Sequence, residues 1–167
     1  FNRNNILFLD ILDKTKQVVK ETVSDFSYTH NNLFPEELHL ELTYRCNSKC
    51  IMCDLWDFYR RNPSFKIKDE LNLDDIKKIM ETSKYLQNIK TVLFSGGEPF
   101  LRKDFVKICG FFAQWYKKAS IGILSNCIDY KLTVNKIKEI LDKYKPHSLW
   151  IGTSLDGIDV GHDRIRK

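Results

Sequence analysis

The chain has 167 residues, of which 43% are hydrophobic and 13% aromatic, and a formal net charge of +5. This composition is typical of a globular domain that buries a core, and it argues against a disordered tail. The 27 Lys and Arg residues are spread along the sequence instead of forming a block, so nucleic acid is not favoured as a partner.

The sequence also bears on the compartment. No stretch approaches the ~20 apolar residues that a membrane span needs, and the apolar run at 6–12 is interrupted by Asp10. Three of the five cysteines lie within 46–53, too close together for an ordinary disulfide framework. We therefore expect a soluble cytoplasmic protein with a metal site and no membrane partner. Because the chain begins at Phe1 and ends in an expected helix start at 163–167, we interpret it as part of a longer protein.

Hydrophobic periodicity predicts a helix at 6–23, followed by strands that alternate with helices. The expected later elements are a strand at 38–42, a helix from Asn72 or Asp74 to about 86, a strand at 91–94, a helix capped by Asp104 that runs to 115, a strand at 121–124, a helix at 134–141 and a strand at 149–154. This alternation implies right-handed crossovers and a parallel sheet.

Polar motifs follow each of the four expected strands. They are Cys46, Gly96-Gly97-Glu98, Ser125-Asn126 and Ser154-Leu155-Asp156. In a parallel sheet or barrel the active site lies at the carboxyl ends of the strands. The sequence therefore predicts a functional site at this edge.

The cysteine motif has three residues between Cys46 and Cys50 and two between Cys50 and Cys53. This spacing allows a loop to turn all three sulfurs toward one site. Three thiolates leave one iron of a [4Fe–4S] cluster free to bind a small molecule. On these residues alone zinc remains an alternative, with His39 or Asp54 as a further ligand, and the chain would then be a non-catalytic metal-binding module.

These motifs together resemble the radical S-adenosylmethionine (SAM) superfamily over residues 38–167. The segments Thr43-Tyr44-Arg45-Cys46 and 162–166 are similar to the branch that contains cofactor-biosynthesis and SPASM-type peptide-modifying enzymes. The resemblance implies an α/β fold, a partial (β/α) TIM-like barrel with about four β/α units. It also implies an N-terminal helical segment at 1–36 and a core domain at 37–167 that is truncated at its carboxyl end.

The resemblance implies an enzyme in which Cys46, Cys50 and Cys53 hold a [4Fe–4S] cluster that reductively cleaves SAM. The resulting 5′-deoxyadenosyl radical would abstract hydrogen from a peptide or small-molecule substrate. A reductant such as a flavodoxin or ferredoxin is implied as a further partner.

The Gly-Gly-Glu-Pro motif has an implied role in binding SAM. Gly96 and Gly97 would let the backbone approach the cofactor, Glu98 would pair with its ammonium group, and Pro99 would complete the motif. A simple strand-ending turn is the alternative for the two glycines. Met52 stands where the family often has an aromatic residue near the adenine.

The remaining implied cofactor-binding residues follow the third and fourth strands. Ser154 would face the ribose or carboxylate of SAM, Asp156 belongs to the same motif, and Ser125 and Asn126 would face SAM or substrate. Each could instead cap the next helix, and the residues leave that alternative open.

Overall fold

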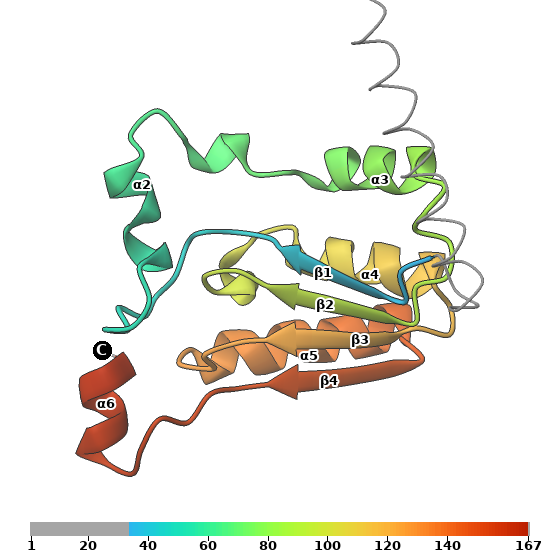
Figure 1. The fold of residues 1–167 in the computed structure, drawn as a ribbon. Coiled ribbons are helices and arrows are strands. Elements are labelled where there is room, and N and C mark those ends of the chain that lie inside the picture. Colours follow the sequence, from blue (N-terminus) through green and yellow to red (C-terminus); the bar gives the residue numbers. More distant parts are fainter. Residues whose placement is uncertain (1–33, 167) are drawn as a thin grey trace, which may run out of the picture. The chain divides into compact units, whose positions relative to one another are not determined.

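Residues 34–166 are described by the computed structural model, so the helix expected at 6–23 lies outside them. From Glu36 onward the chain forms one compact unit. Within this part, four parallel strands form a single sheet in the order β1-β2-β3-β4 (Figure 1). Among residues 34–166, no helix is both long and apolar enough to cross a membrane.

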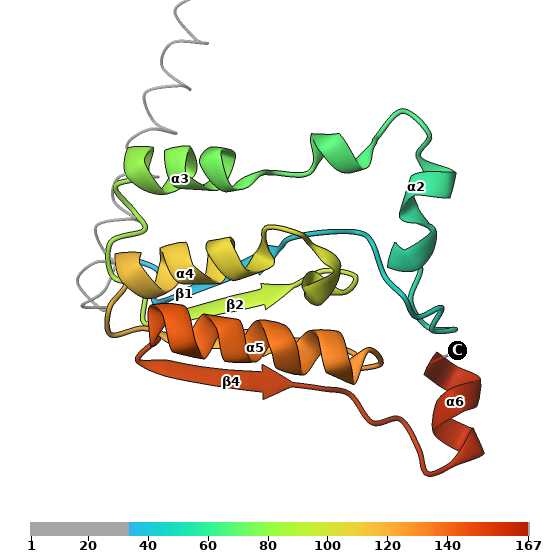
Figure 2. The ribbon, with the colours of Figure 1, turned by 180° about the vertical axis from the view of Figure 1, so that it is seen from behind.

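The strands and helices alternate along the chain as the sequence predicts. Their bounds are β1 (Glu37–Glu41), α3 (Leu73–Thr82), β2 (Thr91–Ser95), α4 (Phe105–Trp115), β3 (Ser120–Leu124), α5 (Tyr130–Tyr144), β4 (Ser148–Gly152) and α6 (Val160–Arg166). Figure 2 shows α4 and α5 on one face of the sheet. The predicted α/β class with parallel strands is confirmed, and the arrangement is consistent with a partial TIM-like barrel.

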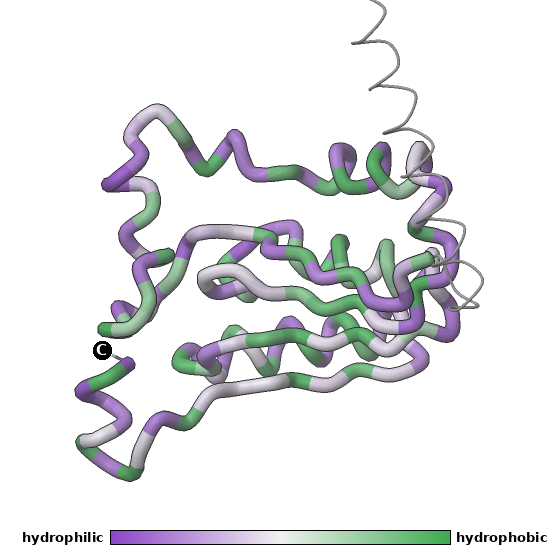
Figure 3. The backbone as a smooth tube through the Cα atoms, viewed as in Figure 1, coloured by the Kyte–Doolittle hydropathy of each residue, from purple (hydrophilic) through white to green (hydrophobic). Residues whose placement is uncertain are grey.

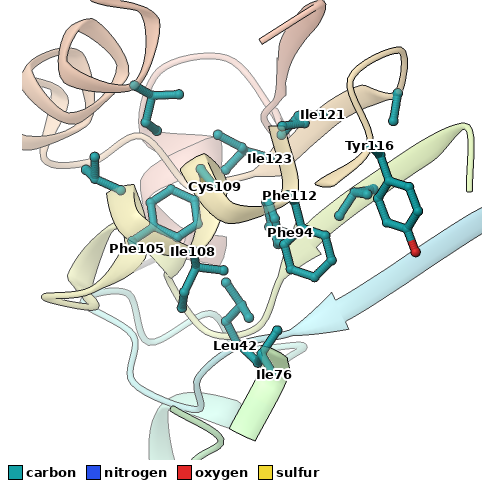
Figure 4. Packing of buried hydrophobic residues seen from close by; sticks show 14 of the residues in the cluster. Leu42, Ile76, Phe94, Phe105, Ile108, Cys109, Phe112, Tyr116, Ile121 and Ile123 are labelled. Carbon is teal, nitrogen blue, oxygen red and sulfur yellow. The ribbon is translucent and has the colours of Figure 1, made fainter. Parts of the chain in front are cut away.

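The core lies between the sheet and the helices. Val92 pairs in register with Ile121 and Phe94 with Ile123, and all four side chains are buried. The ring of Phe94 packs edge to face on Phe112 of α4, with 5.5 Å between ring centroids (Figure 4). Burial of each such side chain contributes about 1.5–3 kcal/mol, so this layer holds the strands in place. Figure 3 shows hydrophobic residues concentrated along β2, β3 and α4.

The other face of the sheet carries different side chains. Trp150 of β4 lies against Gly122 of β3, where a Cβ would come within 2.3 Å of the indole ring. Trp150 is 42% exposed. His39 of β1, whose nearest chain neighbours Leu38 and Leu40 pack on the core, is exposed here and hydrogen-bonds to Ser95 at 2.7 Å.

Helix α3 ends earlier than the expected position near 86. Asn72 caps its start as predicted, with Oδ1 accepting from two backbone amides. The backbone becomes extended at Ser83, so the helix stops at Thr82, and Leu86 reaches the core from the following loop. Ile76 and Met80 of this helix are buried, whereas Ile79 is 46% exposed.

Helix α5 is longer than expected and β4 is shorter. The Asp129 carboxylate accepts a hydrogen bond from Leu132 N at 3.0 Å, which starts the helix at Tyr130 instead of 134. Strand β4 ends at Gly152, whose carbonyl accepts from Ser125 N at 3.0 Å, so Ser154 lies in the loop beyond the strand.

The segment between the cysteines and α3 contains short elements that the sequence analysis did not predict. They are η1 (Leu55–Asp57), α2 (Phe58–Arg61) and η2 (Ile67–Asp69). The rings of Tyr44 and Phe58 stack with centroids 3.9 Å apart, and Phe65 contacts both edge to face. This aromatic cluster joins the segment to the start of the cysteine loop. Such short helices contain too few residues to produce a recognisable hydrophobic periodicity.

Candidate functional site

The loop that leads from β1 to Cys46 runs directly beside the loop that follows β2. Gly97 N donates to Thr43 O at 2.6 Å, and Glu98 N donates to Arg45 O at 2.7 Å. The parallel pairing of β1 with β2 therefore continues past the ends of the strands. As a result the Gly-Gly-Glu motif lies next to the first cysteine.

This close approach explains both glycines. Gly96 has a φ of 135°, and a Cβ there would lie 2.3 Å from Thr43 O. A Cβ on Gly97 would lie 2.2 Å from Arg45 O. Contacts this short are not tolerated against backbone atoms, so the cysteine loop itself requires glycine at both positions. Their expected role in giving SAM access to the backbone stays a prediction.

Glu98 is buried, with 3% of its surface exposed. Its Oε1 accepts from Phe100 N at 3.1 Å and from Ser125 Oγ at 3.0 Å, and Oε2 accepts from Asn126 N at 2.8 Å. Burial raises the pKa of this carboxyl above its ordinary value, although the hydrogen bonds act in the opposite direction. Glu98 thus ties the β2 loop to the β3 loop, and pairing with a SAM ammonium group stays a prediction.

Cys46 accepts hydrogen bonds from two sides. Ser48 N lies 3.4 Å from its Sγ, and Asn126 Nδ2 lies 3.6 Å from the same atom. Asn126 Nδ2 also donates to Asn47 Oδ1 at 2.8 Å. Burial raises the pKa of the Cys46 thiol, while the bonds from Ser48 and Asn126 lower it. The β3 loop therefore contacts the cysteine loop through a side chain that the sequence singled out.

The other two cysteines have different surroundings. Cys50 is buried, and its Sγ lies 3.0 Å from Ser48 Oγ and 3.6 Å from Arg166 O at the end of α6. Cys53 is exposed on a turn in which its N–H bonds to Cys50 O at 3.2 Å. Over residues 34–166, no three His, Cys, Asp or Glu side chains are grouped to hold one metal ion. The predicted convergence of the three sulfurs on one cluster stays a prediction.

The donor set nevertheless has the chemistry of an iron–sulfur site. Cys46, Cys50 and Cys53 are all free thiols on one loop. Thiolates are the ligands by which proteins hold such clusters, and in a cubane each thiolate binds its own iron instead of sharing one ion. The three residues therefore fit the group.

Four predicted site residues meet in one depression at the carboxyl ends of the strands. They come from the loops after β2, β3 and β4, which the parallel sheet brings to the same edge. The depression is lined by Gly97, Leu124, Ser125, Asn126, Gly152, Thr153, Ser154 and Arg166.

Four predicted cofactor-binding residues are not among those that line this depression: Gly96, Glu98, Pro99 and Asp156. The surroundings of Gly96 and Glu98 are described above. Pro99 is buried and starts the 3-10 helix η3 (Pro99–Leu101), so its contribution is to the turn after Glu98. Asp156 is exposed and pairs with Arg166, which connects the β4 loop to the end of α6. Neither position is tested as a cofactor contact, and both remain predictions.

A buried ion pair that the sequence motifs did not predict lies behind the cysteine loop. Glu70 Oε1 accepts from Thr43 Oγ1 at 2.6 Å and from Tyr44 N at 3.0 Å, and its Oε2 lies 3.8 Å from Arg102 Nη1. The Arg102 and Glu70 side chains are 5% and 6% exposed. Asp104, expected to cap α4, instead binds Arg102 Nη2 at 2.7 Å. Arg102 follows the Gly-Gly-Glu-Pro motif closely, which was an available signal, whereas Glu70 gave none.

The comparison with known families decides the assignment. Residues 40–167 match the Radical SAM superfamily. The chain belongs to this superfamily. Radical SAM proteins use a [4Fe–4S] cluster and SAM, which agrees with the three free cysteines on the loop after β1.

Several radical SAM proteins are similar to the chain. Fe-coproporphyrin III synthase of Methanosarcina barkeri is 30% identical over 125 residues, covering 75% of this chain and 28% of that protein. GTP 3′,8-cyclase of Staphylococcus saprophyticus is 31% identical over 124 residues, covering 74% and 34%. The crystal structure of Streptococcus suis SuiB bound to S-adenosylmethionine superposes with a TM-score of 0.56 at 25% identity, covering 92% and 33%. These relatives are consistent with the expected cofactor-biosynthesis and SPASM-type branch, and the chain spans about a third of their length or less.

Proposed function

We propose that the chain works in a radical SAM enzyme and that Cys46, Cys50 and Cys53 hold its [4Fe–4S] cluster. When bound, the cluster and SAM supply a reductive cleavage that yields a 5′-deoxyadenosyl radical, which takes hydrogen from a peptide or small-molecule substrate. The chain's own residues position these groups at the carboxyl edge of the sheet.

The observation that supports the proposal most strongly is that hydrogen bonds hold three loops together at the carboxyl edge of the sheet. The bonds from Gly97 N to Thr43 O and from Glu98 N to Arg45 O hold the β2 loop against the cysteine loop. The side chain of Asn126 joins the β3 loop to Cys46. A structural zinc site requires only its metal ligands. A cofactor-binding enzyme requires metal ligands and also a depression beside them in which the cofactor binds.

The residues of the depression have distinct roles in this proposal. Gly97, Ser125 and Ser154 line the space in which SAM lies beside the cysteine loop. Glu98 holds the β2 and β3 loops together through Ser125 and Asn126, so it fixes the shape of that space. Gly96 and Pro99, which lie on either side of Gly97 and Glu98, determine the backbone path of the β2 loop.

The proposal extends to the partners. A low-potential donor such as a flavodoxin or ferredoxin supplies the electron, in the cytoplasm. The names of two relatives refer to coproporphyrin III and GTP, which supports a small molecule as one substrate class. A peptide is the other class that this branch suggests.

Anaerobic reconstitution with iron and sulfide tests the cluster. We expect about four irons per chain and broad charge-transfer absorption, both lost in Cys50→Ala because a ligand is removed. Cys109→Ala is the matched control, since Cys109 is buried in α4 away from the loop, and it should keep the iron. Tight zinc binding without iron uptake would contradict the proposal.

Incubation of the reconstituted protein with SAM and dithionite tests the chemistry. The expected product is 5′-deoxyadenosine, absent when either reagent is omitted. An intact four-iron cluster that forms no nucleoside would refute the catalytic part of the proposal while leaving the cluster assignment in place.

A further inference from the structure

The side chain of Asn126 is held in one orientation. Its backbone N donates to Glu98 Oε2 at 2.8 Å, and its Oδ1 accepts from Ile128 N at 3.0 Å. A carboxamide has an acceptor end and a donor end, so fixing the oxygen on Ile128 N also fixes the direction of the NH₂ group. That group points at the cysteine loop.

Both hydrogens of this NH₂ group have partners in the cysteine loop. One bond goes to Asn47 Oδ1 at 2.8 Å and the other to Cys46 Sγ at 3.6 Å. Sulfur is a larger atom than oxygen, so a hydrogen bond to it is longer. The NH₂ group of Asn126 thus makes both of its hydrogen bonds to the cysteine loop, one of them directly to Cys46.

We propose that Asn126 tunes the cluster by donating an N–H···S hydrogen bond to the Cys46 thiolate, which raises the reduction potential of the cluster. The inference rests on the proposed function, because it requires a cluster on Cys46. Reduction adds an electron whose charge spreads onto the sulfurs. A hydrogen bond to a sulfur stabilises the more negative, reduced state more than the oxidised state.

The same bond has a positioning effect. It joins the loop after β3 to the first cysteine, while Glu98 joins the backbone of Asn126 to the loop after β2. Asn126 thereby couples the place of Cys46 to the walls of the depression. It is a positioning residue in this account, since its side chain acts through Cys46 and not on the reacting atoms.

Redox titration of the SAM-free, reconstituted protein, monitored by electron paramagnetic resonance (EPR), tests the inference. Asn126→Ala should be harder to reduce. At the potential where the wild type is half reduced, we expect its ratio of reduced to oxidised cluster to fall by up to about tenfold, which corresponds to about 59 mV for one electron. Asn126→Asp should shift further in the same direction, because it replaces the donor by a negative charge.

Ile128→Ala is the matched control. It alters an exposed side chain in the same loop but keeps the backbone N–H that orients Asn126. Its potential should equal that of the wild type. An Asn126→Ala protein with four irons and an unchanged potential would overturn the inference and leave the proposed function intact. A wild type that takes up no iron would overturn both.

A second measurement needs no variant at Asn126, in case its replacement prevents iron uptake. Protein carrying ¹⁵N in its asparagine side chains should show a ¹⁵N coupling in pulsed EPR of the reduced, SAM-free cluster. The coupling should persist in labelled Asn47→Ala, which removes the other amide of this contact. A spectrum without that coupling would overturn the inference.

Discussion

At Gly97 the space available for a side chain is set by the backbone of the cysteine loop. A Cβ would lie 2.2 Å from Arg45 O and 2.6 Å from Arg45 C, and neither atom can move unless the loop itself moves. The hydrogen bond from Gly97 N to Thr43 O would be lost with that movement. Gly97 is therefore tied to the position of Cys46 before any cofactor is considered.

Gly97→Ala should separate the two loops. We expect a loss of about 1–3 kcal/mol in the free energy of unfolding, as for other overpacked sites, and impaired iron uptake. Urea denaturation and iron analysis measure the two effects. Gly161→Ala is the control, because within the described structure a Cβ there meets no atom within 4 Å. Equal stability and iron content in the two variants would show that the close approach is unimportant.

The buried carboxyl of Glu98 predicts that the stability of the fold depends on pH. Burial raises the pKa of Glu98 in the folded state above the ordinary value of 4.5, which applies in the unfolded state. At a pH between the unfolded-state pKa and the folded-state pKa, the folded chain therefore binds more protons than the unfolded chain. The contribution of Glu98 to stability should therefore decline as the pH rises through that window.

Urea unfolding of the wild type and Glu98→Gln, from about pH 4 to about pH 7, isolates this contribution, because groups elsewhere titrate equally in both proteins. The stability advantage of the wild type over Glu98→Gln should shrink as the pH rises. An advantage that grows with pH would mean that the hydrogen bonds from Ser125 and Asn126 outweigh burial.

Among the elements, Arg102 connects segments that are distant in the sequence. Its guanidinium donates to Leu42 O at 2.5 Å and to Leu71 O at 3.0 Å, and it pairs with both Glu70 and Asp104. The end of β1, the segment before α3 and the start of α4 thus share one buried cation. This network supports the cysteine loop from behind.

Arg102→Met should be strongly destabilising. Removing one partner of a buried ion pair leaves an uncompensated charge and costs about 3–5 kcal/mol. Arg60→Met, at a side chain that is 78% exposed, should change stability by less than about 0.5 kcal/mol. Chemical denaturation of both variants makes the comparison. A small effect of Arg102→Met would mean that Glu70 and Asp104 find other partners.

The regular elements could be predicted because their causes are local. Val92 and Phe94 belong to a short apolar run, and Asn72 precedes a helix with the usual capping geometry. The pairing of Glu70 with Arg102 could not be predicted, because it depends on a fold that brings together residues from separate irregular segments. The motif residues were found from their spacing, but their hydrogen-bond partners required the structure.

At the scale of the whole molecule, the cysteine loop contacts the sheet loops and α6. Ile51 N donates to Ile165 O at 2.9 Å, and Arg166 O lies near Cys50 Sγ. The cysteine loop follows the edge strand β1, and α6 follows the opposite edge strand β4, so this contact joins segments that follow the two edges of the sheet. A group bound by the three cysteines should stabilise all of these contacts together.

Cluster binding should accordingly raise the global stability. A ligand that binds the folded chain and not the unfolded chain shifts the unfolding equilibrium by mass action. The reconstituted protein should unfold at a higher urea concentration than the same protein after removal of iron by a chelator. Cys50→Ala should show no such difference. Equal midpoints for the loaded and stripped wild type would contradict the prediction.

The indole of Trp150, lying against Gly122 on the sheet face opposite the core, gives the molecule an intrinsic optical probe. Because Trp150 is 42% exposed, its fluorescence depends on contact with water at that face. Any strand, substrate or partner that covers the ring would move its emission to shorter wavelengths. Comparison with Trp150→Phe would assign the signal, so occupancy of this face can be followed in solution without an added label.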